Sequence, residues 1–359
     1  MKEKLVNFSQ RTSLRQLRAL GALVEAGNIA GAADALALTP PAVSQQLRLL
    51  EDALGGVPLF ERTPAGARPT EAGREALTAL LRIEAALADC AAAVDALRGL
   101  DGGRVAVGIV STAKYFAPFA LAAFQRQYPH VELRVRVSNR AEMVAAFEAF
   151  ELDLAIMGYP PDHLALERVV LGDHPHVIIA APDHPLVGRG RIGLDEAATQ
   201  SFLLREPGSG TRDLVQRLFG AAEAMGGRRI EIGSNETIKQ AVMAAMGVAL
   251  ISAHTVAAEV ADGRLVILDV EGLPVMRQWF LVRRTEKRPL PAAAALWAYL
   301  VEHGEGFLPR VGSVGAGTGA GRAQGRRAGG GGADRGGGDR EPGSARGGAA
   351  PNARTTRRP

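Results

Sequence analysis

Residues 14–62 read LRQLRALGALVEAGNIAGAADALALTPPAVSQQLRLLEDALGGVPLFER, and this stretch decides the fold of the N-terminal part of the chain. Apolar residues recur at three- and four-residue spacing over 14–26, which predicts an amphipathic helix. Small residues dominate 29–36 and predict a second, closely packed helix. A threonine-proline pair at 39–40 predicts the start of a third helix, which ends near Leu54. Two short helices joined by a tight turn, the second polar on one face, indicate a helix-turn-helix, a motif that places its second helix in the DNA major groove.

Polar residues of the third predicted helix and of the segment after it are the candidate DNA contacts. Ser44 and Gln45 can hydrogen-bond base edges, and Arg48 can reach a guanine or a phosphate. The start of the helix suits a phosphate, and the basic residues after it suit the DNA backbone or the minor groove. Ordinary solvated surface is the alternative for any single member of the set. The predicted contacts with double-stranded DNA are Thr39, Pro41, Ser44, Gln45, Arg48, Arg62, Arg68 and Thr70.

The net charge of the whole chain does not indicate DNA binding. The chain carries +4 at pH 7. Nine arginines and three acidic residues give residues 311–359 a charge of +6, so the rest of the chain carries −2. The prediction of DNA binding therefore depends on the helix-turn-helix and its local charges.

Other features of the sequence argue against whole classes of protein. No run of eighteen apolar residues is present, which argues against a membrane-spanning helix. The first residues, MKEKLVNFSQRTS, lack the apolar core of a signal peptide. Cys90 is the single cysteine, which excludes an internal disulfide and suits a reducing compartment. We therefore expect a cytoplasmic protein that does not associate with a membrane.

Residues 70–98 form one long predicted helix with a narrow apolar stripe. Such a stripe is typical of a helix that packs against a copy of itself. We favour this dimerisation helix over the alternative, a helix that covers its own domain. The stripe consists of Leu77, Leu80, Leu81, Leu87, Ala91, Val94 and Leu97. Asp101-Gly102-Gly103 then predicts a hinge.

From Arg104 onward, strands and helices alternate, which indicates an α/β fold with a mostly parallel sheet covered by helices on both faces. The predicted strands include 104–110, 177–181 and 278–283, and a helix is expected over about 114–128. Glycine, alanine and arginine dominate the chain after Leu308, and such a composition cannot bury a core, so we expect disorder there.

Four segments follow from this reading. Residues 1–70 are the expected DNA-binding domain and 71–100 the linker and dimerisation helix. Residues 101–308 are the expected effector-binding regulatory domain, and 309–359 a disordered Gly/Arg-rich tail.

Hydroxyl, amide and basic side chains follow several predicted strands, at the turns into helices. Free backbone N–H groups at such turns attract anions, and open α/β sheets bind ligands at the carboxyl ends of their strands. Each turn alone is better explained as a plain helix cap. Together the turns predict a cleft for a small anionic metabolite, with no metal and no other cofactor. The candidate residues are Ser111, Thr112, Lys114, Arg205, Ser209, Thr211, Asn235, Glu236, Thr237 and His254.

A catalytic constellation is missing from the sequence. His174, His176 and His184 suggest a metal cluster, but no matching cysteine or glutamate array accompanies them, and a solvated loop is the favoured alternative. The GSGT string at 208–211 lacks the Gly-Lys-Ser/Thr of a phosphate-binding loop. No Gly-x-Ser-x-Gly elbow is present either. We therefore do not expect an enzyme.

The N-terminal stretch resembles the DNA-binding domain of the LysR-type transcriptional regulators. The resemblance lies in TPPAVS at 39–44, LEDALGGVPLFER at 50–62 and GARPTEAG at 66–73. It implies an all-α winged helix-turn-helix, a long linker helix and a two-lobed effector domain like that of periplasmic binding proteins. It also implies homodimers or homotetramers, with RNA polymerase as a further candidate partner. Pro40 departs from the family pattern, because many members carry a base-reading glutamine at this position. The proline removes that base contact, so the resemblance does not define the operator sequence.

The C-terminal part is similar to the CbbR subgroup of this family. The similarity lies in STAKYFAP at 111–118, LLREPGSGTR at 203–212 and GSNETIKQAVMAAMG at 233–247. That subgroup controls carbon dioxide fixation genes of the Calvin cycle and responds to small phosphorylated metabolites. The resemblance thus implies an activator of such genes with an anionic effector in the cleft between the lobes. A regulator of another metabolic operon with a different effector is the alternative, and a solute-binding protein is less favoured.

Overall fold

The computed structural model describes residues 11–97, 103–220 and 226–310 of the chain. The sequence predictions for Asp101, Gly102 and the tail 311–359 therefore lie outside the described residues. None of the helices in the described ranges is long and apolar enough to cross a membrane.

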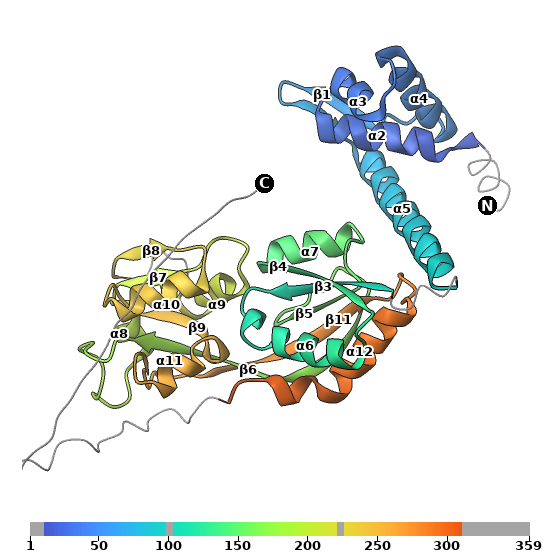
Figure 1. The fold of residues 1–359 in the computed structure, drawn as a ribbon. Coiled ribbons are helices and arrows are strands. Elements are labelled where there is room, and N and C mark those ends of the chain that lie inside the picture. The colour runs from blue at the N-terminus through green and yellow to red at the C-terminus, as the bar shows by residue number, and fades with distance from the viewer. Residues whose placement is uncertain (1–10, 98–102, 221–225, 311–359) are drawn as a thin grey trace, which may run out of the picture. The chain divides into compact units, whose positions relative to one another are not determined.

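Three helices form the N-terminal head (Figure 1): α2 (Leu14–Ala26), α3 (Ile29–Leu36) and α4 (Pro40–Ala53). The predicted bounds agree with these to within one residue. The agreement has a local cause, because each helix begins at a polar side chain that accepts a hydrogen bond from a backbone N–H of the first turn. These capping residues are Ser13, Asn28 and Thr39.

A β-hairpin completes the winged helix-turn-helix. Its strands, β1 (Phe60–Thr63) and β2 (Gly66–Pro69), pair antiparallel. The three helices and the hairpin enclose one apolar core, to which fully buried Leu20, Leu50 and Leu59 belong. The polar face of α4 is therefore available on the surface of the head, because its apolar face supplies part of this core.

The predicted apolar stripe lies on the long helix α5 (Glu71–Leu97) and has two parts that differ in burial. Leu77 and Leu80 pack against the core of the head. Leu81, Leu87 and Val94 are exposed. The helix thus covers its own domain at its start and exposes apolar side chains further along. Dimerisation through these exposed side chains stays a prediction.

A seven-stranded sheet forms the framework of the second part of the chain. The strands at its centre are β3 (Arg104–Val110), β5 (Leu154–Met157), β11 (Val275–Arg284) and β6 (Leu166–Ala180). Three shorter strands complete it: β4 (Glu132–Ser138), β9 (Ala249–Ser252) and β10 (Val266–Ile267).

The expectation of a mostly parallel sheet is wrong. Only β3–β4 and β3–β5 are parallel among the described pairs of this sheet, whereas β6 pairs antiparallel with β9, β10 and β11. The predicted strand 177–181 covers only the end of the much longer β6, whereas the predicted strand 278–283 covers the inner part of β11. The sequence concealed the rest because Gly172 and Pro175 lie inside β6, and both residue types are unusual in central strands.

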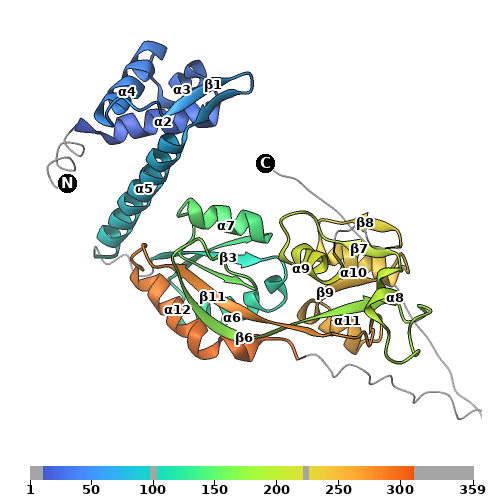
Figure 2. The ribbon, with the colours of Figure 1, turned by 180° about the vertical axis from the view of Figure 1, so that it is seen from behind.

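Strands β6 and β11 run side by side through two lobes, as Figures 1 and 2 show. The helices of the first lobe are η1 (Ala113–Tyr115), α6 (Ala117–Gln127), α7 (Arg140–Glu148), α12 (Pro291–His303) and η4 (Gly304–Phe307). The predicted helix 114–128 is interrupted at Phe116, because Pro118 favours a new helix start beside it.

The second lobe carries a small parallel sheet of β7 (Phe202–Leu204) and β8 (Arg229–Glu231). Its helices are α8 (Leu194–Ala198), α9 (Gly210–Phe219), α10 (Asn235–Met243), η3 (Ala253–Thr255) and α11 (Ala257–Ala261). The two lobes have separate apolar clusters. They are therefore two packing units that β6 and β11 connect.

We predict that Gly73→Ala destabilises the head by about 1–3 kcal/mol, the usual range for overpacking. A Cβ at residue 73 would lie 1.9 Å from the carbonyl oxygen of Leu59, which is backbone and cannot rotate away. Gly21→Ala is the control, because its Cβ would meet only the methyl end of the Leu80 side chain, at 2.9 Å. Thermal unfolding followed by circular dichroism measures both variants, and equal effects would contradict the prediction.

Candidate functional site

The exposed face of α4 presents the predicted base-reading residues. Gln45 and Arg48 are exposed, while Val43 and Leu47 on the opposite face are buried. Ser44 is half-buried, and its hydroxyl donates to the carbonyl oxygen of Pro40 at 2.9 Å. The Ser44 hydroxyl therefore keeps chiefly its acceptor capacity, whereas no hydrogen bond or ion pair among the described residues occupies the Gln45 amide or the Arg48 guanidinium.

The other predicted DNA contacts flank this helix. Thr39 caps α4 and is exposed together with Pro41. Arg62 and Arg68 are exposed on the two strands of the wing. Thr70 has a structural task, because its hydroxyl donates to the Pro58 carbonyl at 2.8 Å and accepts from the Gly73 N–H at 3.1 Å. Its role in DNA binding stays a prediction, as do the roles of the other seven residues.

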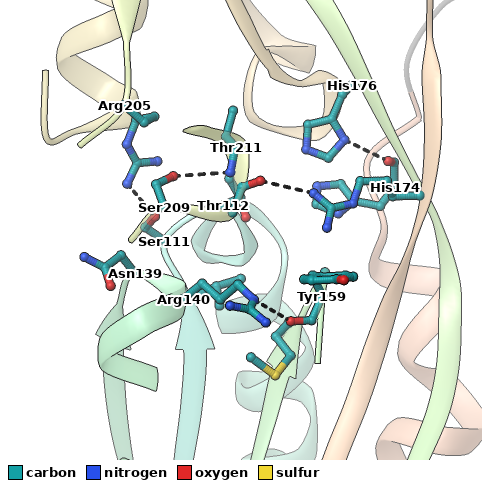
Figure 3. Close-up of a pocket in the computed structure, with 15 residues that line it drawn as sticks. Ser111, Thr112, Asn139, Arg140, Tyr159, His174, His176, Arg205, Ser209 and Thr211 are labelled. Carbon is teal, nitrogen blue, oxygen red and sulfur yellow. Dashed lines mark hydrogen bonds between the residues drawn. The ribbon is translucent and has the colours of Figure 1, made fainter. Parts of the chain in front are cut away.

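A small cavity lies between the lobes, and residues of both lobes and of strands β6 and β11 line it. Figure 3 shows its polar lining, to which both lobes and both connecting strands contribute. The polar lining residues are Ser111, Thr112, Asn139, Arg140, Tyr159, His174, His176, Arg205, Ser209, Thr211 and Arg277.

Half of the predicted effector residues line this cavity. They are Ser111, Thr112, Arg205, Ser209 and Thr211. They converge because β3 ends at Val110 in one lobe and β7 ends at Leu204 in the other, so the following turns face each other. The sequence argument from strand ends therefore located the cavity, although the sequence could not show which turns meet.

The other five predicted residues are placed around the cavity and do not line it. Asn235 accepts a hydrogen bond from Arg205, and His254 accepts one from the indole N–H of Trp279 at 3.0 Å. Glu236 accepts from the Tyr115 hydroxyl at 3.2 Å, and the Lys114 ammonium lies 5.2 Å from the Tyr115 ring. Thr237 is exposed. Asn235, Glu236 and His254 therefore support residues around the cavity through hydrogen bonds, whereas Lys114 and Thr237 have no such role among the described contacts.

The Arg205 guanidinium already forms hydrogen bonds with other protein groups. Its guanidinium donates to both carboxylate oxygens of Glu206, to Asn235 and to the Ser111 hydroxyl in the opposite lobe. The side chain is almost completely buried, and Glu206 balances its charge. Arg205 therefore positions Ser111 and has little positive charge left for a ligand.

Arg140 and Arg277, which the site prediction omitted, supply the cations of the cavity. Each guanidinium lies about 5 Å from the Tyr159 ring, at 4.8 and 5.1 Å. Arg277 donates to the Gly210 carbonyl at 3.2 Å and Arg140 to the Tyr159 carbonyl at 2.9 Å. Burial, with a further contribution from Arg217, lowers the pKa of Arg277 to about 10, so it stays charged at neutral pH.

His174 and His176 form part of the same wall. Burial is the main cause that lowers the pKa of His174 well below its ordinary value, and His176 adds to it. Burial, followed by the charge of Arg277, lowers the pKa of His176 to about 3. Both imidazoles are therefore neutral at pH 7. The described residues contain no group of three or more side chains suited to a metal ion.

The cavity can accommodate an anion. Its lining includes three arginines, of which Arg205 is paired with Glu206, five hydroxyl-bearing side chains and the start of α9 at Gly210, and no acidic side chain is among its described lining residues. Charged donors in a buried site form strong hydrogen bonds with carboxylate or phosphate oxygens. The site prediction missed Tyr159 and Arg277. Tyr159 follows the predicted strand 152–157 but was not selected, and its proximity to Arg277 depends on the pairing of β5 with β11.

A DNA-binding head joined to a two-lobed ligand-binding domain defines a transcription regulator. Two family descriptions match the chain: "Bacterial regulatory helix-turn-helix protein, lysR family" over residues 14–74 and "LysR substrate binding domain" over residues 98–305. The chain belongs to the LysR family of transcriptional regulators. Since this is a family of regulators, the chain is not an enzyme, in agreement with the sequence prediction.

Within this family, the chain is similar to several individual regulators. The HTH-type transcriptional regulator CbbR of Xanthobacter flavus is 51% identical over 301 residues, which are 83% of this chain and 90% of that protein. The RuBisCO operon transcriptional regulator of Allochromatium vinosum is 39% identical over 300 residues, 84% of this chain and 99% of that protein. The solved regulatory domain of Synechocystis PCC6803 CcmR in complex with 2-PG is 36% identical with a TM-score of 0.53, and the match covers 55% of this chain and 96% of that one.

We predict that His176 makes the stability of the protein fall on acidification. Its pKa is about 3 in the folded chain and about 6.5 when unfolded. Between these two pKa values, the His176 imidazole is therefore protonated in the unfolded chain and neutral in the folded chain. The free energy of unfolding should fall by about 1.4 kcal/mol per pH unit for this group between pH 6 and 4.

Urea unfolding followed by tryptophan fluorescence tests this, because both tryptophans, Trp279 and Trp297, are buried in this domain. The variant His176→Asn should show the shallower dependence on pH, and His163→Asn, which changes an exposed histidine, should match the wild type. Identical slopes for His176→Asn and the wild type would show that the prediction is wrong.

Proposed function

We propose that the protein binds an operator through α4 and the wing, and that a small phosphorylated anion in the cavity modulates its control of carbon dioxide fixation genes. The observation that carries the effector part of the proposal is the cavity itself. Arg140 and Arg277 face it together with serine and threonine hydroxyls, and the described lining includes no carboxylate.

The phosphate is supported by a structural relative. The CcmR regulatory domain, 36% identical, was solved with 2-PG, 2-phosphoglycolate, a molecule with a phosphate and a carboxylate. A ligand with two anionic groups suits a cavity with two free arginines and several hydroxyl donors. We therefore assign a phosphorylated carboxylate or sugar phosphate as the effector class.

The operon is supported by the similar regulators. The names of the relatives from Xanthobacter flavus and Allochromatium vinosum connect them with CbbR and the RuBisCO operon. The alternative is a different metabolic operon with a different anionic effector. A solute-binding protein is disfavoured, because the chain carries the helix-turn-helix of the family.

We assign distinct roles to the DNA-binding residues. Gln45 and Arg48 are the proposed base readers, since their donors are free and exposed. The rest of the set positions the head on the DNA backbone or in the minor groove, with Thr70 acting through its cap on α5. These positioning residues are Thr39, Pro41, Ser44, Arg62, Arg68 and Thr70.

The proposed assembly is a homodimer through α5, with homotetramers built from such dimers. The support is the exposed stripe of Leu81, Leu87 and Val94, which a second copy of the helix can cover. We retain the division into a DNA-binding segment 1–70, a linker helix 71–100 and an effector-binding segment 101–308. RNA polymerase is the further proposed partner of an activator.

The effector can act only if it binds two arrangements of the lobes with different affinity. Hydrogen bonds among the described residues join the lobes beside the cavity. Arg205 donates to Ser111, Tyr115 donates to Glu236, and the Ala141 N–H donates to the Gly208 carbonyl. A ligand that contacts both lobes competes with or reinforces these bonds, which would favour one arrangement.

Replacing Arg48 with alanine should weaken binding to a promoter fragment of a carbon dioxide fixation operon by about 1–3 kcal/mol, the usual value of a specific arginine contact. Fluorescence anisotropy with labelled DNA measures the change, and unrelated DNA of equal length reports non-specific binding. Arg126→Ala removes an equal charge from the exposed surface of the regulatory domain and should bind normally. Unchanged binding by Arg48→Ala would remove this residue from the interface.

Replacing Arg277 with glutamine should lower the affinity for 2-phosphoglycolate by tenfold or more, because a hydrogen bond to a charged group contributes about 1.5–3 kcal/mol. Isothermal titration calorimetry measures the affinity, and binding to promoter DNA without ligand should not change. Arg264→Gln, which alters an exposed arginine outside the cavity, is the control. Full affinity in Arg277→Gln would place the anion elsewhere.

A further inference from the structure

His176 presents a hydrogen-bond acceptor to a cavity otherwise lined mainly by donors. Its Nδ1 lies 3.2 Å from the carbonyl oxygen of His174. A carbonyl oxygen only accepts, so Nδ1 must carry the proton that forms this bond. In a neutral imidazole the other nitrogen, Nε2, is then an acceptor.

The surroundings of His176 keep the ring neutral and fixed. Its backbone lies in the sheet opposite Ser252 of β9 and Val275 of β11, and its side chain is buried. The Arg277 guanidinium disfavours a second positive charge beside it. His254, which accepts from the Trp279 indole, is also neutral at pH 7. His176 is therefore neutral at pH 7 in the ligand-free protein.

The open nitrogen lies on the side of the cavity. Figure 3 shows His176 bonded to His174 on one side of the ring, while the remainder of the ring lies toward Thr211. His174 stacks on Trp279 with ring centroids 3.7 Å apart, and neither of its ring nitrogens has a partner among the described residues although it is almost completely buried. His174 in this wall thus has unused hydrogen-bonding capacity, and for the His176 Nε2 no described hydrogen bond is present.

An anionic oxygen does not fit against His176 Nε2, because two lone pairs would face each other. A hydroxyl group fits, since it donates to the imidazole while the anionic groups of the same molecule bind Arg140 and Arg277. We propose that the effector carries a hydroxyl group in addition to its phosphate, and that His176 accepts a hydrogen bond from it. The inference rests on the proposed function and adds that phosphate esters with a hydroxyl group bind more tightly than those without one, such as 2-phosphoglycolate.

Two matched pairs of compounds test the inference on the full-length wild-type protein by isothermal titration calorimetry. The first pair is 3-phosphoglycerate and 3-(phosphonooxy)propanoate, which lacks the 2-hydroxyl. The second pair is glycerol 3-phosphate and propyl phosphate. A buried acceptor left without its donor costs binding energy, so we expect the hydroxylated member to bind at least tenfold more tightly in at least one pair.

Two substitutions identify His176 as the acceptor. His176→Asn places an amide donor near the position of Nδ1 but has no atom near Nε2, so the preference should fall to within twofold while both compounds still bind. His176→Gln places an amide oxygen near the position of Nε2 and should restore part of the preference. His163→Asn, at an exposed histidine outside the cavity, should retain the wild-type preference, and thermal unfolding verifies that each variant is folded.

The outcomes separate this inference from the proposed function. Equal affinity within both pairs for the wild type would overturn the inference alone, because the phosphate site would still function. A preference that persists in folded His176→Asn would also overturn it. Binding of none of the four compounds nor of 2-phosphoglycolate would overturn the proposed effector class, and the inference with it.

Discussion

The antiparallel pairing of β6 with β11 is the constraint on which the regulatory domain depends. The register runs from Val275 opposite His176 to Arg284 opposite Leu166, and it shifts once, between Trp279 and Phe280. This register places Arg277 opposite His174. The same two strands connect the lobes, so the wall of the cavity and the connection between the lobes are one structural element.

The positive character of the cavity is created locally and not by the composition of the chain. Without residues 311–359 the chain has a net negative charge. The nearby arginine that the sequence emphasised, Arg205, is balanced by Glu206 and tied to Asn235. Arg140 and Arg277 remain without a carboxylate among the described ion pairs, and they lie about 5 Å from the Tyr159 ring, where the face of the aromatic ring stabilises a cation without removing its charge.

The sequence predicted those features whose causes are local. Ser13, Asn28 and Thr39 mark helix starts by themselves, and the bounds of the head helices followed from them. Strand ends likewise located Ser111, Ser209 and Thr211 at the cavity. The direction of β6 and the place of Arg277 depend on pairing between residues about a hundred positions apart, and no local pattern encodes such pairing. His174 and His176 were read as a loop for the same reason, because Gly172 and Pro175 interrupt the strand pattern that places them in the sheet.

The apolar clusters lie within the lobes, whereas hydrogen bonds join the lobes beside the cavity. This difference explains how a small ligand can change the arrangement of the two lobes. Each lobe keeps its own apolar clusters, so a rotation about β6 and β11 need not open either core. Arg205, Tyr115 and Gly208 make the hydrogen bonds that join the lobes beside the cavity, and the net contribution of each such bond is only about 1 kcal/mol. A ligand held by Arg140 of the first lobe and Arg277 of β11 would contribute free energy of comparable or greater size. The balance between lobe arrangements can therefore be decided in the cavity, provided that the ligand binds one arrangement more tightly than the other.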